Sequence, residues 1–208
     1  MTTPEQPVFY IDLDRTLFRT ESANEIFAMV EYLYPENYRA RGGYTKRAEH
    51  YVYPRVSEGD TTTYYHDVSQ WLRDVGIDAK EAFERMVVSV IADGRFEYPG
   101  VEELVRSLQT YGEVKLLTYG EGMYQRFKAR LCPSLHGIEV ITTVQPKAEF
   151  LNRYAREGDW MIDDKEIVGL KPRIETVRIV HDKTVAGVCA SLQEVEAVVV
   201  GRLQDRVA

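Results

Sequence analysis

The sequence predicts an α/β fold with a mostly parallel sheet, helices on both faces of that sheet, and a small all-helical insert. Two observations predict the sheet. Short apolar segments alternate with helical patterns over the second half of the chain, and these segments are rich in β-branched or aromatic residues. A third observation predicts the insert, because residues 20–97 contain several helical patterns and no convincing strand. Strands that alternate with helices of this length usually form a parallel sheet that is covered on both sides.

Five segments have the length and composition of buried strands. Each is short and apolar, as expected for a strand inside a parallel sheet. They lie at residues 8–11, 114–117, 138–141, 160–162 and 177–180. The first segment lies far from the other four along the chain, so the insert follows directly after the first strand.

Three helical patterns separate the later strands. In each pattern, apolar residues recur at the three- and four-residue spacing that puts side chains on one helix face. The patterns are Leu104, Val105 and Leu108 after the turn Pro99-Gly100, then Tyr124, Phe127 and Leu131 before Pro133, and then Phe150, Leu151 and Tyr154 before Gly158. Glycine and proline are typical residues at such helix boundaries.

Three further helical patterns fall within the insert. The sequence Ser22-x-x-Glu25 has the form of a capping box and predicts the start of the first helix. The threonines at 61–63 are candidate caps of the second. The apolar positions are Ile26, Phe27, Val30 and Leu33 before Pro35, then Val68, Trp71, Leu72 and Val75, and then Ala82, Phe83, Met86, Val87, Val90 and Ile91.

Composition argues against several functional classes. The 208 residues are 44% hydrophobic, enough for one core with a small insert, and the formal net charge is −7. This charge does not favour nucleic acid or an anionic membrane surface as a partner. Residues 1–7 do not resemble a signal peptide, and the aliphatic run 198–200 is far shorter than a membrane span. Because Cys132 and Cys189 suit core positions in a reducing compartment, we expect a globular protein of the cytoplasm.

Two acidic residues directly follow the first predicted strand. Asp12 and Asp14 stand two positions apart, so in extended geometry their side chains would point to the same side and could face one pocket. In an open α/β sheet, ligands bind at this carboxyl end of the strands. A calcium loop would need glycine and an acid where this chain has Leu17 and Ala23. A solvated turn is the ordinary alternative, but two carboxylates this close favour a bound cation.

A second predicted strand also ends in adjacent acids. Residues 160–162 are followed by Asp163 and Asp164, either of which could simply cap a helix. In a parallel sheet, however, the carboxyl ends of the strands share one edge, so these acids could converge with Asp12 and Asp14. Such a cluster requires a divalent cation. Mg²⁺ suits hard oxygen ligands and pairs with substrate phosphate.

Two further residues have both an ordinary and a functional interpretation. Thr118 follows the strand 114–117 and would usually be structural, but its hydroxyl and the next N–H groups could hold a phosphate oxygen. Lys147 opens a helix, where the macrodipole disfavours a cation. A lysine is ordinarily a solvated surface charge, whereas an anionic site nearby would explain this position.

Taken together and in this order, these motifs resemble the haloacid dehalogenase (HAD) superfamily over nearly the whole chain. The matching residues are Asp12, Asp14 and Thr16 after the first strand, then Thr118, Lys147, Asp163 and Asp164. The resemblance implies a Rossmann-like α/β core of residues 1–19 and 98–208, with a helical cap of residues 20–97. Arg15 departs from the pattern, because the family's phosphatases more often have glycine there.

The resemblance also implies a role for each side chain. Asp12 would be the nucleophile that attacks phosphorus, and Asp14 would protonate the leaving oxygen and then activate water. Because an acid must carry a proton, we expect a raised pKa for Asp14. Thr118 and Lys147 would bind the phosphoryl oxygens. The ligands of Mg²⁺ would be Asp12, Asp14 through its carbonyl, Asp163 and Asp164. Of the last two, Asp164 is expected to be the direct ligand.

The implied function is that of a Mg²⁺-dependent phosphatase acting on a small phosphorylated metabolite through an aspartyl-phosphate. The acid at position 14 favours phosphate esters, since the family's dehalogenases and phosphonate hydrolases lack it. A phosphotransferase or mutase with the same intermediate stays open, as does a non-catalytic module that senses metal or phosphate. The basic and aromatic segment 38–47, with the aromatic and histidine residues at 50, 51, 53 and 64–66, could line the substrate pocket. It could equally form a solvated turn and the core of the cap.

Overall fold

A five-stranded sheet lies at the centre of the computed structural model, which describes residues 6–40, 52–54, 64–89 and 94–206. The strands are β1 (Val8–Ile11), β4 (Glu113–Tyr119), β5 (Glu139–Thr143), β6 (Trp160–Asp163) and β7 (Glu175–Arg178). Their order is β5-β4-β1-β6-β7, and every neighbouring pair is parallel. The predicted α/β fold is therefore confirmed, and the first predicted strand is the middle strand of the sheet.

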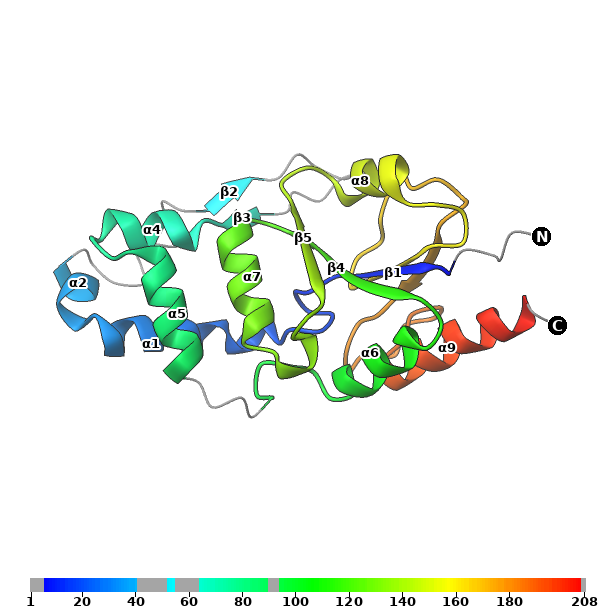
Figure 1. Cartoon of the computed structure of the whole chain (residues 1–208), viewed down its shortest axis with the longest axis horizontal. Helices are drawn as coiled ribbons and strands as arrows, with labels where there is room; N and C mark the ends of the chain where they lie inside the picture. Colours follow the sequence, from blue (N-terminus) through cyan, green and yellow to red (C-terminus); the bar gives the residue numbers. More distant parts are fainter. Residues whose placement is uncertain (1–5, 41–51, 55–63, 90–93, 207–208) are drawn as a thin grey trace.

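Helices cover both faces of this sheet. They are α6 (Val101–Gln109), α7 (Gly122–Arg130), α8 (Lys147–Tyr154) and α9 (Leu192–Asp205), with a short 3₁₀ turn η2 (Pro133–Leu135). In Figure 1, α6 and α9 lie on one side of the sheet and α8 lies on the other. Side chains alternate along β1 in the same way: Phe9 and Ile11 pack into the core with α6 and α9, whereas Tyr10 packs into a second core with α8.

The insert lies between β1 and α6, and its described residues form helices and a hairpin. The helices are η1 (Thr20–Ser22), α1 (Ala23–Leu33), α2 (Pro35–Ala40), α4 (Val68–Asp74) and α5 (Ala79–Ser89). The hairpin consists of β2 (Val52–Pro54) and β3 (Tyr64–His66), which pair antiparallel. The prediction of an all-helical insert was wrong in this respect, because strands of three residues are too short to show an alternating pattern. Residues 90 and 91, expected in the third insert helix, lie outside the described residues. The division into a core of residues 1–19 and 98–208 and a cap of residues 20–97 stays a prediction.

Two helix starts differ from the predicted capping. Ser22 has helical backbone angles (φ −75°, ψ −5°), so η1 runs directly into α1, and the Ser22 hydroxyl makes no capping hydrogen bond. An N-cap needs an extended backbone to turn its side chain toward the first turn. Helix α4 is capped instead by Asp67, whose carboxylate accepts the Gln70 N–H at 2.8 Å. Residues 61–63, the predicted caps, lie outside the described part of the chain.

Helix α7 joins the sheet to the insert. It lies between the two in Figure 1, and the insert faces the carboxyl ends of the central strands. Phe83 of α5 stacks on Phe127 of α7 with ring centroids 4.5 Å apart. Arg130 at the end of α7 pairs with Glu84 of α5 at 2.5 Å. One hydrophobic cluster therefore continues from the sheet through α7 into α1, α4 and α5.

Two expectations about individual segments can be compared with the structure. Cys132 and Cys189 are free thiols, and both are buried, which agrees with their interpretation as core residues. Across the described ranges, every helix is too short or too polar to cross a membrane.

Candidate active site

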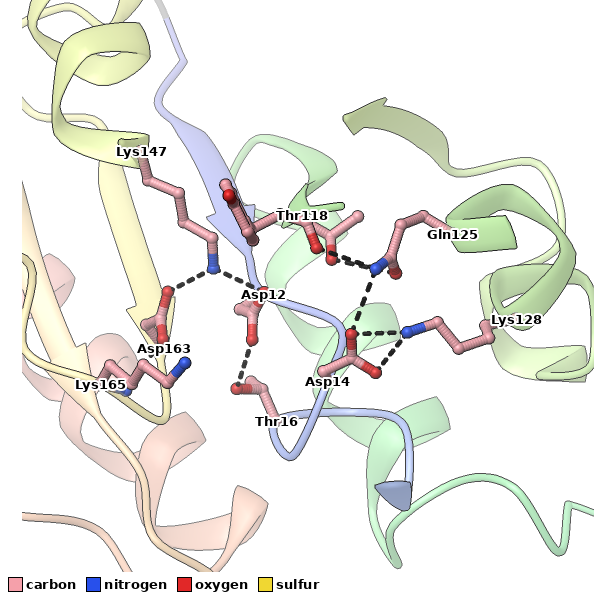
Figure 2. A network of polar contacts seen from close by, with 10 residues as sticks. Asp12, Asp14, Thr16, Thr118, Gln125, Lys128, Lys147, Asp163 and Lys165 are labelled. Atoms are coloured by element: carbon pink, nitrogen blue, oxygen red, sulfur yellow. Dashed lines mark hydrogen bonds and ion pairs between the residues drawn. The ribbon is translucent and has the colours of Figure 1, made fainter. Parts of the chain in front are cut away.

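Three neighbouring strands bring the predicted site residues to one edge of the sheet. Asp12 follows β1, Thr118 lies near the end of β4, and Asp163 ends β6 (Figure 2). The Asp12 N–H donates to the Ile162 carbonyl oxygen of β6 at 2.9 Å, so the chain is still aligned with the sheet at the first acid. Because β1 lies between β4 and β6, residues that are far apart in sequence meet around Asp12.

Lys147 lies between two of the carboxylates. Its Nζ is 2.5 Å from Oδ1 of Asp12 and 2.6 Å from Oδ2 of Asp163. All three residues are buried, with 4–5% of their surface exposed. A buried charge needs a partner, and the two acids also offset the unfavourable position of an ammonium group at the start of α8. The structure thus brings Lys147, Asp12 and Asp163 together in one ion-paired group.

Asp164 completes a group of three acids. Oxygens of Asp12, Asp163 and Asp164 all lie within 4.8 Å of one another. Both oxygens of Asp163 already have partners, since Oδ1 accepts the Lys165 N–H at 2.8 Å and Oδ2 binds Lys147. In their ionised forms, the three carboxylates outnumber the one ammonium that lies between them, so negative charge is in excess. A donor set of hard oxygens with this excess charge fits a divalent cation such as Mg²⁺.

The pKa values at this site reflect burial first and then the excess of negative charge. Burial, with repulsion from Asp163, Asp164 and Asp14, raises the pKa of Asp12 from 3.8 to about 7, although Lys147 opposes the shift. Burial and Asp163 raise the pKa of Asp164 to about 6. For Lys147, burial disfavours the ammonium form, but Asp12 and Asp163 outweigh it and raise the pKa. A cation bound among these oxygens would relieve the repulsion.

Asp14 faces a different group of residues. Its two carboxylate oxygens each lie 2.5 Å from Nζ of Lys128, and Oδ2 also accepts from Nε2 of Gln125 at 3.3 Å (Figure 2). The three-acid group found among the described residues does not include Asp14. Burial raises the pKa of Asp14, but the charge of Lys128 and the hydrogen bonds from Lys128 and Gln125 lower it more. The prediction of a raised pKa was wrong, because it did not include a lysine from α7.

Two threonine hydroxyls adjoin these acids. Oγ1 of Thr16 donates to Oδ2 of Asp12 at 3.5 Å, and Oγ1 of Thr118 donates to Oε1 of Gln125 at 3.3 Å. The N–H of Gly120 was expected to be among the groups that could hold a phosphate oxygen. It donates instead to the carbonyl oxygen that ends β5, at 2.9 Å. The Thr118 hydroxyl is therefore linked to Asp14 through Gln125, whereas the Gly120 N–H is used in pairing with β5.

The turn after β1 holds Arg15 in an unusual backbone conformation. Arg15 is exposed and has φ +63°, in the left-handed region. The turn around it is tight, because the Leu13 carbonyl oxygen accepts the N–H groups of Leu17 at 3.0 Å and Phe18 at 2.8 Å. Glycine reaches this conformation without the steric penalty of a side chain. A glycine at this position would therefore adopt the observed backbone with less strain than Arg15.

Sequence reasoning missed two residues of the site, Gln125 and Lys128. Both are 4% exposed and lie three positions apart on α7, so they share one face of the helix. The available signal was a pair of polar residues at this spacing among the apolar Tyr124 and Phe127. In the sequence, such a pair cannot be distinguished from a solvated helix face.

Part of the expected substrate pocket lies outside the described residues. This applies to most of the segment 38–47 and to His50 and Tyr51. Tyr53 and residues 64–66 belong to the β2–β3 hairpin.

Comparison with solved structures identifies the fold. No family model matches the chain, and no curated protein matches it. A haloacid dehalogenase-like hydrolase from Burkholderia xenovorans LB400 is similar, with a TM-score of 0.61 at 19% identity, over 93% of this chain and 96% of that one. The magnesium-bound HAD-hydrolase YfnB from Bacillus subtilis gives a TM-score of 0.48 at 16% identity, over 93% and 98%. The first of these similarities, together with the parallel sheet and the insert after β1, shows that the chain has the fold of the haloacid dehalogenase-like hydrolases.

Proposed function

We propose that this protein is a Mg²⁺-dependent phosphatase that hydrolyses a small phosphorylated metabolite. The observation that carries the proposal is the group formed by the buried Asp12, Lys147 and Asp163 with the partly buried Asp164, at the carboxyl ends of β1 and β6. A carboxylate beside a buried ammonium and further hard oxygen donors suits phosphoryl transfer, in which the protein mainly positions groups and stabilises charge.

Asp12 would act as the nucleophile. One of its oxygens would form a bond to phosphorus while the bond from phosphorus to the leaving oxygen breaks, giving an aspartyl-phosphate. The attack brings a carboxylate toward an anionic phosphoryl group, and Lys147 at 2.5 Å from Asp12 would offset the repulsion. Lys147 and Thr118 would bind the phosphoryl oxygens. Their positions on either side of Asp12 in Figure 2 support these roles.

Asp12, Asp163 and Asp164 would hold the Mg²⁺, together with the backbone carbonyl of Asp14. Asp164 is the better candidate for a direct ligand, because both oxygens of Asp163 already accept hydrogen bonds. When bound, the ion would supply positive charge to the transferring phosphoryl group.

Asp14 would act as the general acid of the first step and the general base of the second. It would give a proton to the leaving oxygen in the first step and take one from the water that hydrolyses the aspartyl-phosphate in the second. Since Lys128 and Gln125 lower the pKa of Asp14 in the free protein, its resting form suits the second step. The proton needed for the first step would be taken up once the substrate is bound.

The replacement Asp12→Asn tests the proposal. We expect it to abolish Mg²⁺-dependent phosphate release from p-nitrophenyl phosphate, because an amide cannot form the acyl phosphate. The protein should stay folded, because Lys147 keeps Asp163 as its ion-pair partner. Asp205→Asn, which changes an exposed acid at the end of α9, serves as the matched control and should keep full activity. Wild-type turnover by Asp12→Asn would contradict the mechanism.

A substrate panel separates the remaining functions. Sugar phosphates, nucleotides and amino-acid phosphates should be compared for phosphate release with Mg²⁺. Release without any added acceptor would argue against a phosphotransferase or mutase. Absence of turnover across the panel, combined with measurable Mg²⁺ binding, would favour a non-catalytic sensing module.

A further inference from the structure

We propose that Lys128 of α7 is a positioning residue that holds the Asp14 carboxylate in place for proton transfer to the leaving oxygen. The inference rests on the phosphatase function proposed above and adds a residue that none of the sequence motifs contains. It predicts that the contribution of Lys128 to catalysis depends on the leaving group. A basic leaving oxygen needs a proton as its bond to phosphorus breaks, whereas a weakly basic one departs without it.

The contacts of Asp14 come largely from one helix. Lys128 Nζ lies 2.5 Å from both carboxylate oxygens, and Gln125 Nε2 lies 3.3 Å from one of them. Gln125 is itself fixed, because the same Nε2 donates to the Tyr119 carbonyl oxygen at 2.8 Å and its Oε1 accepts from Thr118 at 3.3 Å. Asp14 is on a loop, and a third of its side chain is exposed. Its orientation is therefore set by partners on a rigid element, which is what precise proton transfer requires.

The Lys128 side chain is confined by burial and by two aromatic rings. Only 5% of it is exposed, and its ammonium lies 5.0 Å from the ring centre of Tyr124 and 5.5 Å from that of Phe18. Aromatic faces attract a cation but do not neutralise it. A buried ammonium needs an anion, and Asp14 is the carboxylate in contact with it. The packing that orients Lys128 thus also orients Asp14.

Each of the two predicted catalytic acids has its own lysine. Lys147 approaches Asp12 from α8, and Lys128 approaches Asp14 from α7, on opposite sides of the loop in Figure 2. Lys147 also contacts Asp163, so its pair belongs to the group that suits phosphate and metal. Among the described residues, the carboxylate that Lys128 contacts is that of Asp14, so its effect on the reaction would pass through Asp14.

Helix α7 is itself held firmly at its start. The Glu121 side chain caps it, accepting the N–H groups of Met123 at 2.9 Å and Tyr124 at 2.8 Å. The same carboxylate accepts from the Ser69 hydroxyl of α4 at 2.7 Å. The helix that carries Lys128 is thus fixed both to the end of β4 and to the insert.

Leaving-group dependence provides the test. The value of kcat/KM is measured for a series of aryl phosphates from p-nitrophenyl to unsubstituted phenyl, because it reports the steps up to formation of the aspartyl-phosphate. For Lys128→Met, we expect kcat/KM for phenyl phosphate to fall at least about ten-fold more than for p-nitrophenyl phosphate, as part of the roughly 10²–10⁴-fold that a general acid contributes. Asp14→Asn should lower the ratio of kcat/KM for phenyl phosphate to kcat/KM for p-nitrophenyl phosphate further than Lys128→Met does.

Two controls separate positioning from a structural role. Arg130→Met removes another cation of α7, one that pairs with Glu84 at the protein surface, and should leave the ratio of the two substrates unchanged. In the Asp14→Asn background, Lys128→Met should have no further effect on the ratio. Should Lys128→Met not fold, Lys128→Arg replaces it, since a guanidinium keeps the charge but not the position of Nζ and should shift the ratio less strongly.

The results distinguish a failure of the Lys128 proposal from a failure of the proposed phosphatase function. If Asp12→Asn is inactive while Lys128→Met and Lys128→Arg both keep the wild-type ratio, the positioning role of Lys128 is overturned and the phosphatase stands. An equal loss on every aryl phosphate would also overturn it, because a structural role affects all leaving groups alike. A smaller loss on phenyl phosphate than on p-nitrophenyl phosphate would overturn it too, because it would mean that the charge of Lys128 opposes proton donation by Asp14 more than its contact aids it. If Asp12→Asn keeps wild-type turnover, the function itself fails.

Discussion

Replacing Lys147 by methionine tests whether the acids at the carboxyl ends of β1 and β6 need a cation to be buried together. The ammonium lies 2.5 Å from Asp12 and 2.6 Å from Asp163, and 6–7% of each of these side chains is exposed. Methionine fills similar space without charge. Lys147→Met therefore leaves two buried carboxylates facing each other with Asp164 nearby, and we expect a large loss of stability in metal-free protein.

The size of the loss follows from burial. Removing one partner of a buried ion pair costs about 3–5 kcal/mol of unfolding free energy. For a chain of this length, about 1 kcal/mol shifts the melting temperature by about 2–4 °C, so we expect a decrease of about 6–20 °C at pH 8 in EDTA. Lys115 is the matched control, because it also bridges two acids, Glu113 at 3.2 Å and Glu139 at 2.9 Å, but these acids are 58–60% exposed. Lys115→Met should cost about 1 kcal/mol or less.

The stability loss of Lys147→Met should depend on pH in a characteristic way. The pKa of Asp12 in the folded protein is about 7, above its ordinary value of 3.8, so the folded state binds more protons than the unfolded state and loses stability as pH rises between these values. Without Lys147 the pKa of Asp12 rises further. The stability deficit of Lys147→Met should therefore be smaller at pH 5.5 than at pH 8, and Mg²⁺ should restore part of it at pH 8. Thermal unfolding measures both. A deficit no larger than that of Lys115→Met, or one that does not change with pH, would refute the reasoning.

Two further predictions concern the unmodified site and its turn. Mg²⁺ should raise the melting temperature more at pH 8 than at pH 5.5, since Asp12 and Asp164, with pKa values of about 7 and about 6, must lose protons to bind it. At a hundred times its Kd, the ion adds about 2.7 kcal/mol to the free energy of unfolding. Asp164→Asn should lose most of this stabilisation. Equal increases in melting temperature at both pH values would contradict the assignment of Asp12 and Asp164 as Mg²⁺ ligands. Arg15→Gly should stabilise the protein by about 0.5 kcal/mol, because relief of the left-handed strain, about 1–2 kcal/mol, exceeds the roughly 0.5–1 kcal/mol of added chain entropy in the unfolded state. Denaturant unfolding measures it, and a destabilised variant would show that the turn at φ +63° is not strained.

The strands and most helices could be predicted because their signals are local. The apolar run at 8–11 and the turn at Pro99-Gly100 mark elements whose form is set by neighbouring residues. The capping of α1 could not be predicted, since it depends on whether the chain at Ser22 is extended or already helical. The β2–β3 hairpin escaped prediction because two short segments become strands only by pairing with each other.

For the candidate site, the sequence by itself determined which acids follow which strands, and a parallel sheet then requires Asp12, Asp163 and Asp164 to meet at one edge. Only the tertiary structure decided what compensates each charge. Lys147 was predicted from its place in the order of the motifs, and it does lie between Asp12 and Asp163. Lys128, in contrast, reaches Asp14 from a helix whose packing against the insert is not encoded by any local sequence pattern. The reason is physical. A strand end places a residue through the backbone, but the pKa of a buried carboxyl is set by burial and by charges within a few ångströms, which depend on how distant segments pack.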